Sequence, residues 1–273
     1  MEGLALPLAW QPVTAGGVAA FAHARLGRLL VVQFVMALLA ASVAAWFVHR
    51  AWFPVVSAAI EQLPAQGEIR AGRLSWGGTG PQLLGEGRYL AVAVDLNHEG
   101  TVRSPANVAL EFGGGDARIF SLFGFVRWPY PKGWIMPFNR VELKPWWGAW
   151  APPLLAITMV LIILALMLSW SVLATVYYLP VWLIGFFANR DLDLRASWRL
   201  AGAALMPGAL LLTAALVLYG LGVLDLLHLT IALAVHFVVG WVYLVLAPLR
   251  LPRHPQAPAQ GDPFTGSTKA NAS

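Results

Sequence analysis

One stretch of this chain, residues 154–188, runs for 35 residues without a charged side chain. A helix needs about 20 apolar residues to cross the hydrocarbon core of a bilayer. Three further apolar runs of sufficient length lie at 29–48, 200–221 and 226–246. Of all 273 residues, 59% are hydrophobic and 11% are charged, against about 25% charged in soluble domains. So little charge cannot cover a water-facing surface, which excludes a soluble enzyme and predicts an integral membrane protein.

The first run indicates an uncleaved anchor. Arg25 and Arg28 precede it, His49 and Arg50 follow it, and its 20 residues exceed the roughly 7–15 of a signal-peptide core. A cleaved leader with its site near 43–45 is the alternative.

The remaining spans are expected at 151–179, 200–222 and 225–248, the first of them opened by Pro152 and Pro153. Pro180 divides the 35-residue run, so residues 180–199 are expected to form a kinked or interfacial segment and a loop. Two short spans in 154–188 are the alternative. The tail, residues 249–273, is expected to be disordered.

Between the first and second spans the composition changes. Residues 50–147 hold 18 of the chain's 31 charged residues. Apolar and other residues alternate in 89–96 and 107–112, as in half-buried strands, and Gly- and Asn-containing turns lie between the runs. We therefore expect a small antiparallel meander of about four strands, with 68–76 and 117–126 as the outer ones. A helical extension of the first span, ending near Pro64, precedes it.

The arginines predict how the chain is threaded. With four spans, one side receives all seven arginines of the terminal segments and of the loop after the second span: Arg25, Arg28, Arg190, Arg195, Arg199, Arg250 and Arg253. Positive flanks gather on the cytoplasmic side. We expect the N-terminal segment, residues 1–28, and the C-terminal tail to be cytoplasmic. The fold class is then a four-helix membrane protein with a small extracytoplasmic β-rich domain, residues 49–150, between helices 1 and 2.

Two stretches carry a family resemblance. They are Leu63-Pro64 with the following segment 68–74, and the basic amphipathic segment 194–207, which leads into the third span. With the layout of one span followed by three, they resemble uncharacterised bacterial membrane proteins that have a Yip-type C-terminal helical bundle. The resemblance implies a multi-pass protein of the bacterial cytoplasmic membrane with an accessory role, and it implies no catalytic residues.

The sequence offers little chemistry. There is no cysteine, which excludes disulfides and thiolate sites, and no hydrolase, metalloprotease or phosphate-loop motif is present. The acids Glu86, Asp95, Glu99, Glu111 and Asp116 are expected to form a solvated face. Neither a metal nor another cofactor is expected. The scattered net charge of +5 indicates contact with lipid headgroups, not nucleic acid.

A few polar residues in the spans are candidate binding residues. His236 lies about 17 Å into the last helix, near the midplane, and Tyr243 is close to the same face. His236 is interpreted as a neutral histidine hydrogen-bonded between helices, with a ligand or proton site as the alternative. Asp225 is placed to cap the last helix, and His228 to interact with that cap.

A stripe of small residues, Ala37, Ala41 and Ala45, favours close helix packing in the first span. Its contact is either within the bundle or against another protein.

Two functional hypotheses follow. The first is a non-enzymatic accessory or scaffold protein that presents its outer domain to a partner membrane or periplasmic protein. The alternative is a protein that handles a small solute or lipid at an intramembrane site near His236.

Overall fold

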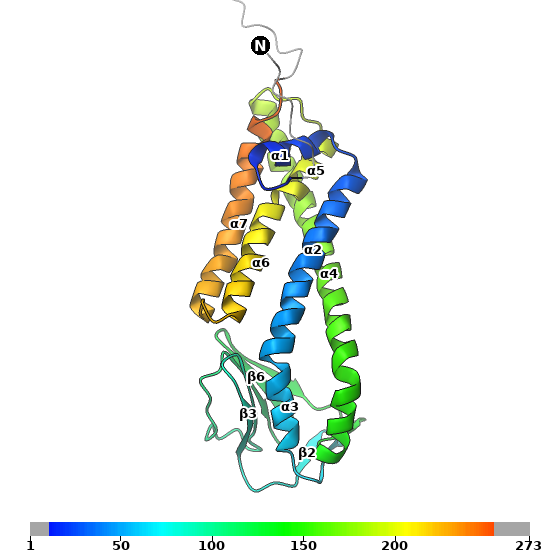
Figure 1. Ribbon diagram of the computed structural model, residues 1–273, viewed down its shortest axis with the longest axis vertical. Helices are drawn as coiled ribbons and strands as arrows, with labels where there is room; N and C mark the ends of the chain where they lie inside the picture. Colours follow the sequence, from blue (N-terminus) through cyan, green and yellow to red (C-terminus); the bar gives the residue numbers. More distant parts are fainter. Residues whose placement is uncertain (1–10, 254–273) are drawn as a thin grey trace, which may run out of the picture. The chain divides into compact units, whose positions relative to one another are not determined.

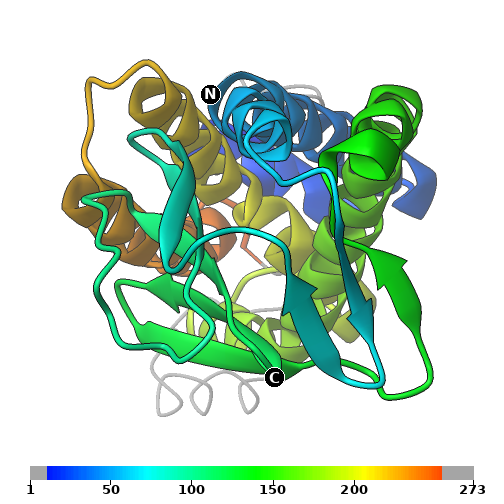
Figure 2. The same ribbon diagram turned by 90° about the horizontal axis from the view of Figure 1, so that it is seen from below.

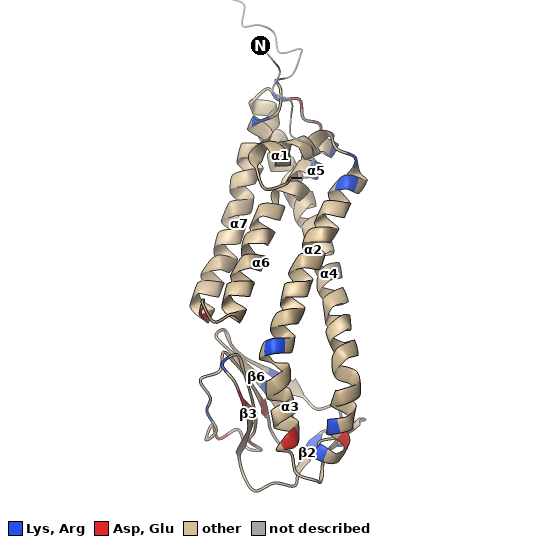
Figure 3. Cartoon of the chain, in the orientation of Figure 1, with Lys and Arg blue, Asp and Glu red and all other residues tan. Residues whose placement is uncertain are grey.

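A computed structural model describes residues 11–253 (Figure 1). Four helical stretches in this part of the chain are long and apolar enough to cross a membrane, as expected from the sequence. They are α2 (Leu26–Ala51) with α3 (Phe53–Glu61), α4 (Arg140–Phe187), α5 (Leu194–Ala204) with α6 (Met206–Gly220), and α7 (Leu226–Leu249). Their ribbons carry few charged residues between the ends (Figure 3). The β-sheet region lies between the first and the second stretch.

The helical extension of the first span is present. α2 gives way at Trp52 to α3, which has a proline in its first turn and ends at Glu61, shortly before Pro64. The extension is therefore a separate short helix that follows the span directly.

The helix that contains the second expected span is longer than that span. A single helix, α4, begins at Arg140, within the range assigned to the outer domain, and continues through Pro180 to Phe187. No separate segment 180–187 follows the span. Proline removes one backbone hydrogen bond, but apolar surroundings offer the flanking backbone no partners other than helical ones, so the helix continues. At 48 residues the helix is about 72 Å long, far more than a bilayer core requires.

The third span also starts earlier than expected. α5 begins at Leu194, where the Asp193 carboxylate caps it by accepting a hydrogen bond of 2.5 Å from the Ala196 amide. Segment 194–199, assigned to a loop, is therefore helical because it has its own N-cap. The proposed disorder of the tail lies outside the described residues from position 254 onward.

The chain forms two compact units, each built from parts of all four spans. The first contains the residues up to Met36, then Leu166–Leu211, and those from Ala234 onward. In it, α1 (Ala15–Ala20) and the 3-10 turn η1 (Phe21–His23) pack with α5 around a core that includes Phe21, Leu29 and Leu200.

Polar contacts in the first unit join segments that are far apart in the sequence. The Arg199 guanidinium donates two hydrogen bonds, of 3.2 and 2.6 Å, to the Ala22 carbonyl. Arg190, in the α4–α5 loop, donates one of 2.7 Å to the Leu251 carbonyl just after α7. The N-terminal segment, the α4–α5 loop and the end of α7 are thus brought together.

The second unit, Ala37–Ala165 with Leu212–Leu233, holds all the described strands. They form two separate sheets, seen from below in Figure 2. The three-stranded sheet has the order β2-β1-β8, with β1 (Gly67–Arg70), β2 (Arg73–Trp76) and β8 (Ile135–Pro137). The five-stranded sheet has the order β3-β4-β5-β6-β7, with β3 (Gln82–Glu86), β4 (Leu90–Val94), β5 (Val108–Phe112), β6 (Asp116–Ser121) and β7 (Gly124–Pro129).

The expected four-strand meander is corrected in two ways. The two outer strands, 68–76 and 117–126, are each a hairpin, β1–β2 and β6–β7. The two central strands, β4 and β5, pair in parallel. Parallel neighbours need a crossover of about a dozen residues or more. The turn-forming Asn97–Gly100 segment is part of that crossover, which runs from Asp95 to Asn107, and is not a hairpin turn.

Helix α3 covers the start of the five-stranded sheet. Apolar side chains of α3, including Val55 and Ala59, share a core with Leu84 and Val92 of the sheet. Gly85 permits the close approach, because a Cβ there would lie 2.6 Å from the Val55 carbonyl oxygen. The extension of the first span thus serves as one layer of the β-rich domain.

Candidate functional site

The second unit carries three arrangements of polar side chains that could bear function. The first fastens the five-stranded sheet to the turn between α6 and α7. Arg88 donates hydrogen bonds of 3.3 Å to the carbonyls of Gly222 and Leu224 in that turn. The Tyr89 hydroxyl donates one of 2.6 Å to the carbonyl of Tyr219, near the end of α6.

Aromatic contacts reinforce this junction. The rings of Phe47, Tyr89 and Tyr219 contact one another with centroids 4.9 to 5.4 Å apart. Asn107, at the end of the β4–β5 crossover, donates a 2.5 Å hydrogen bond to the Tyr219 hydroxyl. The residues just before β4 and just before β5 therefore hold the domain against the ends of α2 and α6.

The second arrangement is a buried charge cluster on the face of the five-stranded sheet away from α3. The imidazole of His98, in the crossover, lies between the carboxylates of Glu111 and Asp116. Nδ1 contacts Glu111, and Nε2 is 3.0 Å from Asp116 Oδ1. Both ring nitrogens therefore face carboxylate oxygens. The absence of a side chain at Gly113 makes room for the His98 imidazole, because a Cβ there would lie 2.0 Å from His98 Nε2.

Arginines of the β6–β7 hairpin complete the cluster. Arg127 Nε is 2.5 Å from Asp116 Oδ2, and Arg118 Nε is 3.6 Å from the same oxygen. Burial alone raises the pKa of Asp116, but its hydrogen bonds with His98 and Arg127 and their positive charges outweigh this effect, so the pKa is lowered. The Asp116 carboxylate is therefore held ionised, and it ties the crossover to the outer strands of the sheet.

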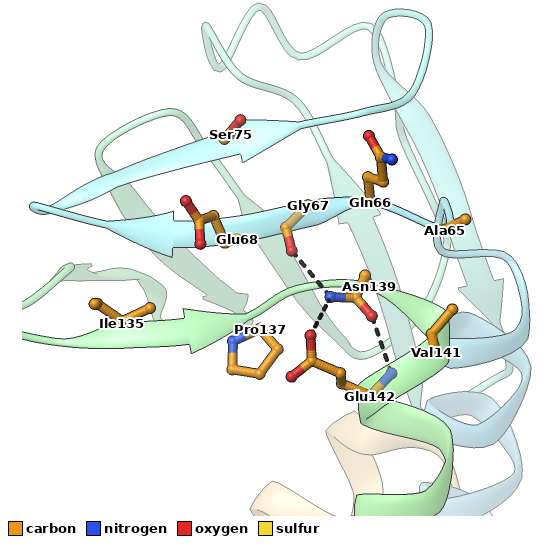
Figure 4. Close-up of a pocket in the computed structure, with 10 residues that line it drawn as sticks. All are labelled: Ala65, Gln66, Gly67, Glu68, Ser75, Ile135, Pro137, Asn139, Val141 and Glu142. Carbon is orange, nitrogen blue, oxygen red and sulfur yellow. Dashed lines mark hydrogen bonds between the residues drawn. The ribbon is translucent and has the colours of Figure 1, made fainter.

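The third arrangement is an open groove of about 690 Å³ between the three-stranded sheet and the start of α4 (Figure 4). Asn139 anchors it: its Oδ1 accepts a 2.9 Å hydrogen bond from the Glu142 amide, and its Nδ2 donates to the Gly67 carbonyl and to Glu142 Oε1. This caps α4 and fixes its first turn against β1. The carboxylates of Glu68 and Glu142 lie along the groove (Figure 4).

The rim of the groove is apolar and accessible. Ile135, in the edge strand β8, and Val141, in the first turn of α4, line it and are both about two-thirds exposed. An edge strand beside a groove that has carboxylates inside and apolar side chains on its rim can receive an extended segment of another chain.

His236 and Tyr243, the candidate binding residues of the last helix, belong to the first unit and not to the three polar arrangements of the second unit. The Tyr243 hydroxyl donates a 2.7 Å hydrogen bond to the Val13 carbonyl in the first unit. His236 packs its ring on Phe237 with centroids 3.9 Å apart. At this level α6 and α7 lie close together, because a Cβ on Gly208 would be 2.4 Å from the His236 carbonyl oxygen.

The expected cap of the last helix is present. Asp225 Oδ1 accepts hydrogen bonds from the backbone amide of His228 (2.8 Å) and from its ring Nδ1 (2.7 Å). His228 is thus engaged in the first turn of α7. In α2, the small residues Ala37, Ala41 and Ala45 are all buried.

The prediction that the five acids of the domain are exposed to solvent is confirmed for two of them and wrong for three. Glu86 and Glu99 are exposed, whereas Asp95, Glu111 and Asp116 are buried. Asp95 Oδ2 accepts a 3.0 Å hydrogen bond from the Gly100 amide and so closes the start of the crossover.

The sequence alone does not reveal the partners of these acids. His98 lies in a segment with the composition of a turn, and the arginines at 118 and 127 are two of the many charged residues of the domain. Alternation placed Glu111 on the polar side of its strand, but nothing local shows that the crossover folds over that side.

Between residues 11 and 253, no group of three or more His, Asp or Glu side chains is arranged to hold a metal ion.

No family model, curated protein or solved structure matches the chain.

Proposed function

We propose that this protein is a non-enzymatic accessory or scaffold protein of the bacterial cytoplasmic membrane. In this proposal its four spans hold the β-rich domain on the extracytoplasmic side, and the domain presents the groove beside β8 to a partner protein. The observation that carries the proposal is the open, 690 Å³ groove with its apolar rim, on a domain fastened to the span ends by Arg88 and Tyr89.

The proposed placement of both terminal segments on one side of the membrane is supported by contacts within the units. Segments expected on the cytoplasmic side contact one another through Arg199 and Arg190. The two segments expected on the opposite side, the β-rich domain and the α6–α7 turn, contact each other through Arg88. Four membrane crossings place the members of each set on the same side of the membrane, so these contacts are consistent with that topology.

Site-directed cross-linking tests the partner proposal. The chain has no cysteine, so a cysteine-linked photo-cross-linker can be placed at one position, by Ser75→Cys within the groove. Thr79→Cys, an exposed position outside the groove, is the matched control. We expect a discrete adduct in native membranes from position 75 and not from position 79. Absence of an adduct at position 75, or equal adducts at both positions, would refute a partner-binding groove.

The alternative, a small-solute or lipid site near His236, has weaker support. Close approach of α6 and α7 at Gly208 and His236 favours packing over a cavity at that depth. A small apolar hollow of about 220 Å³ lies instead beside α2, lined by residues such as Val31, Val35 and Met206. His236→Ala should leave the function unchanged under the scaffold proposal and should alter it under the alternative.

A further inference from the structure

The β6–β7 hairpin exposes an unusual amount of apolar surface. Every residue of β7 is exposed, and Phe123, in the turn of the hairpin, is 83% exposed. The other exposed large apolar residues of the hairpin are Ile119, Leu122, Phe125, Val126 and Trp128. A concentration of exposed apolar side chains in one hairpin indicates a contact with a protein or a membrane.

The register of the sheet shows at which end the hairpin turn lies. Leu90, at the start of β4, pairs with Val108, and the next residue, Ala109, pairs with Phe120 of β6. Ser121 and Gly124 close the hairpin beyond this point. The turn residues Leu122 and Phe123 therefore lie at the same end of the sheet as Tyr89 and Asn107.

That end of the sheet adjoins the ends of the spans. Arg88 and Tyr89 bond to the α6–α7 turn and to Tyr219, and Asn107 bonds to the Tyr219 hydroxyl, all within the second unit. A short turn between two membrane-spanning helices lies at the bilayer surface. The hairpin turn thus points toward the membrane side of the domain, while the turn at Gly113–Gly115 is about 20 Å away, at the other end of the six-residue strand β6.

The composition of the hairpin matches the interface of a bilayer. Phenylalanine and leucine occupy the turn, Trp128 lies farther along β7, and Arg127 is largely exposed between them. Tryptophan favours the headgroup level, phenylalanine and leucine enter the boundary between headgroups and acyl chains, and arginine interacts with anionic lipid. We propose that Leu122, Phe123 and Phe125 insert into the headgroup and acyl boundary of the bilayer that the chain itself spans. The hairpin would be a second, lipid-based attachment of the domain, independent of any partner in the groove.

Fluorescence quenching by lipid tests this inference on the full-length protein. Because the chain has no cysteine, an environment-sensitive fluorophore can be attached at Phe123→Cys, and in a second variant at Leu122→Cys, which keeps Phe123. Gly115→Cys is the matched control, since it is exposed at the far end of β6 and a Cβ there has no atom within 4 Å. Each variant is reconstituted alone in phosphatidylcholine–phosphatidylglycerol vesicles with and without brominated acyl chains.

We expect blue-shifted emission and severalfold stronger quenching by brominated lipid at positions 122 and 123 than at position 115. Equal, weak quenching at all three positions would overturn the inference. So would a blue shift at positions 122 and 123 that appears only in native membranes, since that result would assign the surface to a protein. Because the vesicles contain no partner, the result is independent of the cross-linking at Ser75.

Discussion

At the scale of single residues, the most consequential feature is the ionic contact between the crossover and the hairpin. Asp116 accepts hydrogen bonds from His98 and Arg127, and it is itself buried. A buried carboxylate is costly unless it is paired. The contacts therefore favour a single position of the crossover on the face of the sheet, in which His98 contacts Asp116.

This pairing predicts a loss of stability in acid. The pKa of Asp116 is lowered below its ordinary value of 3.8 in the folded protein. Its ionised form therefore contributes stability above pH 3.8, and this contribution is lost as the pH falls through the folded value. We expect the melting temperature of the β-rich domain to fall over this acid range, and Asp116→Asn to reduce that dependence while lowering the melting temperature at neutral pH.

The measurement is thermal unfolding of the detergent-solubilised protein, followed by near-ultraviolet circular dichroism at each pH. Glu99→Gln, at an exposed acid of the same crossover, is the control and should keep the wild-type profile. An Asp116→Asn profile that falls with acid as steeply as the wild type would contradict the assignment.

At the scale of elements, α3 shows how one sequence segment belongs to two structures. It continues the first span as a helix, and its apolar side chains form a core with β3 and β4. The contact is set by a residue without a side chain, since Gly85 faces the Val55 carbonyl at a distance that excludes a Cβ.

Replacing this glycine should separate the helix from the sheet. In Gly85→Ala the added methyl group would lie 2.6 Å from a backbone oxygen and 3.2 Å from the Ala59 side chain. We expect it to lower the free energy of unfolding of the domain by about 1–3 kcal/mol, the usual cost of overpacking. Chemical denaturation monitored by tryptophan fluorescence would measure this. Gly133→Ala has open space around the added Cβ and should change little; equal effects of the two substitutions would be inconsistent with the tight contact.

At the scale of the whole molecule, the distribution of contacts agrees with four crossings. Each unit joins segments that such a topology places on one side. Which side is cytoplasmic is our proposal from the arginine bias, because positive flanks are retained there.

The orientation can be tested by labelling single cysteines in intact cells with a membrane-impermeant maleimide. Thr79→Cys, in the β-rich domain, should be labelled without permeabilisation, because we place the domain outside. Asp191→Cys, in the α4–α5 loop, should be labelled only after the cells are opened. Both positions are exposed. The opposite pattern would invert the topology, and labelling of both positions in intact cells would rule out the crossing of α4.

The sequence alone determined the features that depend on composition along a short stretch. Long charge-free runs specify four helices that are apolar enough to span a membrane, because a helix satisfies its own backbone hydrogen bonds where no water can do so. The cap at Asp225 and the helix that stops before Pro64 follow from local hydrogen bonding and from the missing amide of proline.

The tertiary structure decided the features that depend on contacts between segments far apart in the sequence. Parallel pairing of β4 and β5 turned an apparent hairpin turn into a crossover, and that crossover carried His98 to Glu111 and Asp116. Acids scattered over strands and turns are usually solvated, which is why the sequence assigned them to solvent. They are buried because a loop and two arginines cover them. The groove at β8 and the position of the hairpin turn likewise arise only when strands pair in register, which no single stretch of sequence encodes.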